Sequence, residues 1–87
     1  MTPHDLAMEE VTLAIRRLTD AMTANDSFLI AQECREGRRV YNGSLKLYPT
    51  LQLRAAERDS LLRQIGLLGS ELERCERLLG PPAAVDA

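Results

Sequence analysis

Six apolar residues in the last third of this 87-residue chain recur at alternating intervals of four and three, and this spacing constrains the fold more than any other feature. Such intervals place side chains in one stripe along an α-helix and are close to the heptad repeat of coiled coils. A second stripe with intervals of three and four lies near the N-terminus. The stripes contain Leu61, Ile65, Leu68, Leu72, Cys75 and Leu79, and Met8, Val11, Ile15, Leu18 and Met22. The sequence therefore predicts a mostly α-helical protein.

Burial of these stripes is the main problem for so short a chain. A chain of this length buries only about 60 to 65% of its unfolded surface, and with one Phe, two Tyr and no Trp its core must be aliphatic. Between Leu61 and Leu68 almost no polar face remains, which predicts a helix that is buried on most sides. We expect a homo-oligomer, and the alternative is an intramolecular core closed by the first helix. The expected oligomer interface is Leu61, Leu62, Ile65, Leu68, Leu72 and Leu79.

Capping and breaking residues predict the helix ends. Thr2 and Pro3 suit a helix start, and the capping residues at 25–27 favour a bend, with one helix continuing to residue 36 as the alternative. Gly37 is a natural helix stop. We expect helices at about 3–23, 27–36, 49–66 and 70–79 in a single domain of residues 1–80, followed by a flexible tail at 81–87.

The second pair of predicted helices depends on a proline and two glycines. Pro49 suits the first position of a helix, and Gly66 and Gly69 each cost about 1 kcal/mol relative to Ala in a helix interior. Because the residues from Ser70 to Glu73 resemble a capping box, we expect a break at the glycines and a separate final helix.

Between the helix pairs the apolar pattern becomes alternating. Asn42-Gly43 is the dipeptide that most readily forms a tight hairpin turn, and it is flanked by short alternating runs. The sequence therefore predicts a short β-hairpin at about 38–47, resting on the helices or on a neighbouring copy.

No residue pattern indicates catalysis. His4 is the only histidine and falls in the first helical turn, where it is expected to be solvated, and the nearby acidic residues suit the helix dipole without a metal. Cys34 and Cys75 lack zinc spacing and are expected to be reduced packing residues. We therefore expect no enzyme activity, no cofactor and no metal.

Neither membrane insertion nor export is indicated. No run approaches the roughly 18 to 20 apolar residues that cross a bilayer, and the first twenty residues lack the basic and then apolar pattern of a signal peptide. The expected location is the cytoplasm.

The formal net charge of −2 hides a basic middle segment. Residues 35–63 carry a net charge of +4, whereas the segments on either side are acidic. The candidate DNA-binding residues are Arg35, Arg38, Arg39, Lys46, Arg54 and Arg58. The alternative is ordinary solvated charge, in which the first two pair with Glu33 and Glu36 and the last two with Glu57 or another chain.

The run from Phe28 to Ser70 contains a series of short motifs: Gly37, Val40, Asn42-Gly43, Leu45-Lys46, Tyr48-Pro49, Leu51, Ala56-Glu57, Leu61-Leu62 and Gly66-Leu67. With these motifs in this order, the run resembles the core of the phage terminase small subunits. The resemblance implies a ring-forming DNA-packaging adaptor in the host cytoplasm that binds double-stranded DNA, the large terminase subunit, or both. The chain departs from the family after Gly66-Leu67 and has no room for a separate helix-turn-helix domain. The alternative function is a small helical protein-protein interaction module, a regulator or inhibitor without DNA contact.

Overall fold

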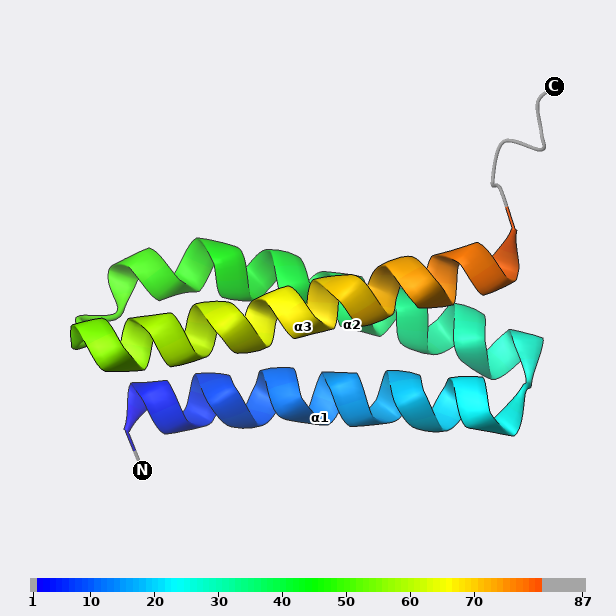
Figure 1. Cartoon of the computed structure of the whole chain (residues 1–87), viewed down its shortest axis with the longest axis horizontal. Helices are drawn as coiled ribbons and strands as arrows, with labels where there is room; N and C mark the ends of the chain where they lie inside the picture. The colour runs from blue at the N-terminus through cyan, green and yellow to red at the C-terminus, as the bar shows by residue number, and fades with distance from the viewer. Residues whose placement is uncertain (1, 81–87) are drawn as a thin grey trace, which may run out of the picture.

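The computed structural model describes residues 2–80 as three helices and one short turn of 3₁₀-helix. These elements are α1 (Pro3–Ala24), α2 (Ser27–Leu47), η1 (Tyr48–Thr50) and α3 (Ala55–Leu79). Each helix packs against the other two, with α1 and α3 running in one direction and α2 in the other (Figure 1). The Cα trace extends 45 × 28 × 15 Å. The predicted mostly α-helical class is confirmed, and the fold of the described residues is a flat three-helix bundle.

The bend between the first two helices follows from local capping chemistry. At the start of α1, the Thr2 hydroxyl accepts a hydrogen bond from the Asp5 amide at 3.1 Å, as predicted. Asn25 ends α1 in the left-handed conformation, with φ of 56°. The Asp26 carboxylate then caps α2 by accepting from the amides of Phe28 and Leu29. The chain therefore turns at residues 25 and 26, and a single helix to residue 36 does not form.

The predicted hairpin at 38–47 is wrong, because α2 continues as a helix through Leu47. Its inner face repeats at helical intervals through Gly37, Tyr41, Ser44 and Tyr48, all buried or half-buried. Asn42-Gly43 lies on the outer face, exposed to solvent. The turn preference of this dipeptide is thus outweighed by the packing of the helix that contains it.

Gly37 does not stop a helix but allows two helices to approach α2 closely. A Cβ atom at this position would lie 3.0 Å from Leu72 Cδ2 and 3.2 Å from Leu18 Cδ1. The residue is buried between α1 and α3. A glycine therefore lets the backbone of α2 pass close to both leucines without crowding them.

Both predicted boundaries in the last third of the chain are also wrong. Pro49 lies in the turn η1, and α3 begins only at Ala55, where Glu57 Oε1 accepts a hydrogen bond from the Arg54 amide at 3.1 Å. No break occurs at the glycines. Gly66 is exposed, and Gly69 packs against the Tyr41 ring, which would lie 2.9 Å from an added Cβ. Packing along the whole stripe keeps α3 continuous to Leu79.

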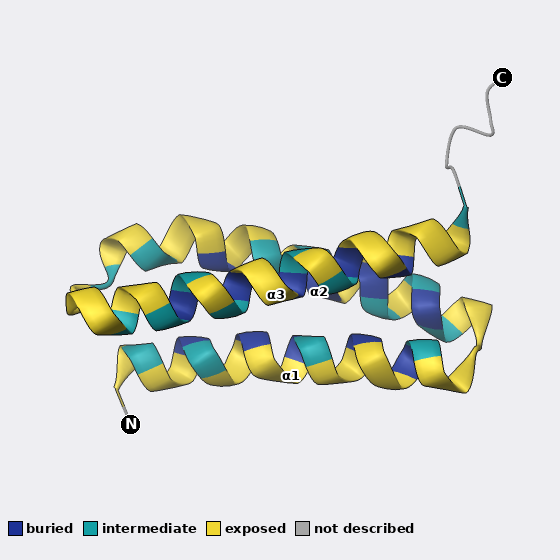
Figure 2. Ribbon diagram, in the orientation of Figure 1, coloured by how far each residue is buried: buried dark blue, intermediate teal, exposed yellow. Residues whose placement is uncertain are grey.

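The core lies within a single copy of the chain. We expected an oligomer interface at Leu61, Ile65, Leu68 and Leu72. These side chains instead lie in the intramolecular core and are at most 2% exposed, so they do not form an exposed surface for another copy. The first helix closes this core, which was the alternative arrangement. Leu62 is half-buried and Leu79 is exposed, so neither belongs to it. Figure 2 shows the buried residues on the facing sides of the helices and the exposed residues along their outer edges. The buried hydrophobic residues are Ala7, Val11, Ala14, Leu18, Ala21, Ile30, Cys34, Leu61, Ile65, Leu68, Leu72 and Cys75. The tail predicted at 81–87 lies outside the described residues.

Candidate interaction surfaces

The two cysteines are buried beside each other, although they are 41 residues apart in the sequence. Cys34 of α2 is 5% exposed and Cys75 of α3 is 0% exposed, and both are free thiols. The Cys75 thiol donates a weak hydrogen bond to the Ile30 carbonyl at 3.8 Å. Burial, followed by the neighbouring Cys34, raises the pKa of Cys75 to about 12. Because thiolate is the reactive form, the packing role is favoured over a redox or nucleophilic one.

His4 is less exposed than predicted. Its Nδ1 lies 3.7 Å from an Asp5 carboxylate oxygen, and its Nε2 is buried without a hydrogen-bond partner. Hydrogen bonds from the Thr2 amide and hydroxyl lower the pKa of Asp5. Across residues 2–80, no three histidine, cysteine or acidic side chains come together as a metal site would require.

Three of the six predicted DNA-binding residues share the outer face of α2. Arg35, Arg39 and Lys46 are separated by four and seven residues, which places them in one stripe on the side opposite Gly37. All three are exposed. Only Arg39 has an ion pair within residues 2–80, to Glu36 in the next turn at 3.6 Å. Exposed pairs of this kind contribute little, so these charges remain available to a ligand.

Arg38 belongs to the contact between α2 and α3 instead. Its Nη2 lies 2.8 Å from Glu76 Oε2, and its guanidinium carbon stands 5.4 Å from the centre of the Tyr41 ring. The expected pairing with Glu33 or Glu36 is therefore replaced by a long-range ion pair that links two helices.

Arg54 and Arg58 lie at the start of α3, beside the end of α2 (Figure 1). Both are exposed, and neither makes an ion pair with another described residue. The backbone amide of Arg54 is bonded to Glu57, but the expected side-chain pairing with Glu57 is absent. The two arginines extend the positive charge of the α2 stripe toward this end of the bundle.

A second surface, missed by the sequence analysis, is apolar. Leu6, Leu13 and Leu47 are 54%, 43% and 46% exposed and line a groove of about 680 Å³ between the first half of α1 and the end of α2. The sequence could have predicted this surface, because Leu6 and Leu13 are seven residues apart and fall outside the buried stripe of α1. An apolar groove on the outside of a small bundle marks a candidate contact surface.

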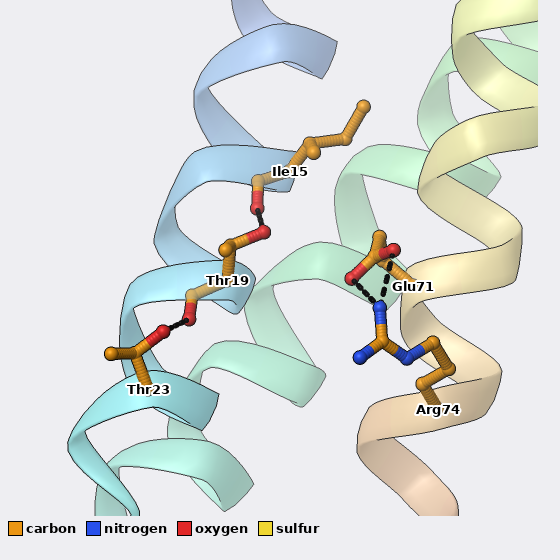
Figure 3. A network of polar contacts seen from close by, with 5 residues as sticks. All are labelled: Ile15, Thr19, Thr23, Glu71 and Arg74. Carbon is orange, nitrogen blue, oxygen red and sulfur yellow. Dashed lines mark hydrogen bonds and ion pairs between the residues drawn. The ribbon is translucent and has the colours of Figure 1, made fainter.

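Several polar side chains of α1 and α3 have partners within their own helix. Thr19 and Thr23 donate to the carbonyls of Ile15 and Thr19, one turn earlier, and Arg74 pairs with Glu71 (Figure 3). These contacts are local and do not join the two helices.

The fold and surfaces define a small three-helix bundle. Among its described residues, no helix is both long and apolar enough to cross a membrane. No known protein family matches the chain, and no curated protein or solved structure is significantly similar to it.

Proposed function

We propose that the chain is a non-catalytic adaptor that binds the phosphates of double-stranded DNA through the outer face of α2, in the manner of a phage terminase small subunit. The observation that supports this function is the stripe of Arg35, Arg39 and Lys46 on one exposed helix face. In this role its protein partner would be the large terminase subunit, and no cofactor or metal would be needed.

The geometry of the stripe suits a polyanion. At 1.5 Å rise per residue, Arg35 and Arg39 lie about 6 Å apart along the helix axis, and Lys46 follows about 10 Å further on. Guanidinium groups bind phosphate in a bidentate manner, and an α-helix fits the major groove of DNA. Glu36 is the acidic residue nearest the stripe and already pairs with Arg39. Arg54 and Arg58 would meet the backbone beyond the end of α2.

Titration of a DNA duplex at several salt concentrations tests the proposal. The wild-type chain should bind the duplex more weakly as salt rises. The triple variant Arg35→Ala, Arg39→Ala, Lys46→Ala should show a shallower slope of log affinity against log salt. The slope should decrease by about 0.9 for each phosphate that is no longer neutralised. Arg63→Ala with Arg77→Ala, which removes two positive charges from the outer face of α3, is the control and should leave the slope unchanged. Absence of binding at low salt, or an equal weakening in both variants, would contradict the proposal.

The second candidate is a helical protein-protein interaction module without DNA contact. The exposed leucines of the α1 groove favour it, because they form a contact surface separate from the basic stripe. The same titration distinguishes the two functions: a module of this kind shows no salt-dependent affinity for the duplex.

A further inference from the structure

Two exposed leucines lie between two rows of charge on the side of α1 that borders its groove with α2, and this side is called the outer face of α1. Leu6 and Leu13 are seven residues apart, which is two helical turns, and both are exposed. Helical geometry places an acidic and a basic residue on each flank of Leu13, one in the turn before it and one in the turn after it. Glu9 and Arg16 lie on one flank, and Glu10 and Arg17 lie on the other.

Glu9, Glu10, Arg16 and Arg17 have no ion-pair partner within residues 2–80. Arg17 shares a groove of about 180 Å³ with Glu33 and Glu36 of α2, yet it pairs with neither. All four are exposed. The chain thus presents an apolar centre with two unpaired acids before it and two unpaired bases after it.

The order of these charges is self-complementary in only one arrangement of two α1 helices. A two-fold axis through Leu13 sets the helices antiparallel, with Leu13 against the partner's Leu13. Glu9 then faces the partner's Arg16 on one edge, and Glu10 faces the partner's Arg17 on the other, so that symmetry gives four pairs of opposite charge. A parallel pair, or an axis midway between Leu6 and Leu13, would set the acidic residues against one another.

We propose that the outer face of α1 is a dimer interface and that its occupant is a second copy of this chain, antiparallel about Leu13. The interface is independent of the basic stripe, which lies on α2. In this register Leu6 lies opposite the partner's Asp20, so the apolar contact is centred on Leu13. A contact limited to one helix face falls in the small, transient class of interfaces, and its exposed ion pairs weaken in high salt.

Charge swaps measured by light scattering or sedimentation test the interface and its register. The wild-type chain should have twice its monomer mass of 9.7 kDa at low salt and at concentrations on the order of 100 µM. Glu9→Arg with Glu10→Arg makes all four charges positive, and Arg16→Glu with Arg17→Glu makes all four negative. Each variant alone should be monomeric. An equal mixture should regain the dimer mass, because every pair formed between the two variants joins opposite charges.

Two further variants complete the design. All four swaps in one chain restore the original complementarity and should restore the homodimer. Arg63→Glu with Arg77→Glu, on the outer face of α3, changes the net charge by the same amount as the negative variant and should remain dimeric. Helix content measured by circular dichroism confirms that each variant is folded. The proposal is overturned if the wild-type chain is monomeric, if the positive variant keeps the wild-type mass, or if the mixture fails to associate.

Discussion

Alanine at two glycines of α2 should change stability in opposite directions. A glycine in a helix interior costs about 0.5 to 1 kcal/mol relative to alanine, so either substitution recovers that amount from the backbone. An added Cβ at Gly43 meets nothing within 4 Å, and the full gain should appear. At Gly37 the same methyl would lie 3.0 Å from Leu72 Cδ2 and 3.2 Å from Leu18 Cδ1.

The penalty at Gly37 arises because neither leucine has room to move. Leu18 and Leu72 are both 0% exposed, so the added methyl overpacks the core, which costs about 1 to 3 kcal/mol. After the backbone gain is subtracted, Gly37→Ala should lower the free energy of unfolding by up to about 2.5 kcal/mol. Gly43→Ala should raise it by about 0.5 to 1 kcal/mol.

Urea denaturation followed by circular dichroism measures both effects. A change of 1 kcal/mol moves Tm by about 4 to 8 °C in a domain of this size, so thermal melts resolve the difference as well. If Gly37→Ala stabilises the chain as much as Gly43→Ala does, then α2 does not approach the other helices at Gly37, and the packing argument fails.

Three further changes test the caps, the core and the buried thiol. Asp26→Ala removes the acceptor for two amides of α2 and should cost about 1 kcal/mol in urea denaturation, whereas an unchanged midpoint would contradict the cap. Leu68→Asp places a carboxylate in the core and should abolish the helical circular dichroism signal rather than merely separate subunits; a folded monomer would contradict this placement. Because burial raises the pKa of the Cys75 thiol from 9.0 to about 12, the folded chain holds a proton that the unfolded chain releases, so the free energy of unfolding should fall as pH rises from about 9 toward 12. Denaturation across this range should show a weaker fall in Cys75→Ala than in wild type, and parallel pH profiles would count against the shift.

The sequence predicted the helices best where an apolar stripe and a cap agree. The start of α1 at Pro3 and the bend before α2 follow from Thr2 and Asp26, whose side chains bond backbone amides in the same segment. The stripe from Leu61 to Cys75 was recognised correctly, but whether it was covered by α1 or by another copy could not be decided, because periodicity identifies a buried face and not its partner.

The wrong hairpin and the wrong helix breaks share one cause, which is that glycine and Asn-Gly have local preferences that tertiary packing overrides. At Gly37 the missing side chain makes room for Leu18 and Leu72, and at Gly69 it makes room for the Tyr41 ring. Sequence alone predicts an interruption at both positions, since the neighbours that use the space lie 19 and 35 residues from Gly37 and 28 residues from Gly69. The basic stripe on α2 could be predicted from helical spacing alone, given that α2 is one continuous helix. The ion pair of Arg38 with Glu76 could not, because no local sequence pattern indicates it.

Because the Cα trace is only 15 Å thick, every helix of the bundle has one side exposed to solvent. Each helix buries one side in the core and leaves the other side as a surface of its own. The leucines and unpaired charges of α1 and the cations of α2 therefore occupy different sides of one short polypeptide. If both proposed surfaces bind their ligands, a second copy on α1 and a nucleic acid on α2 would not compete for the same residues.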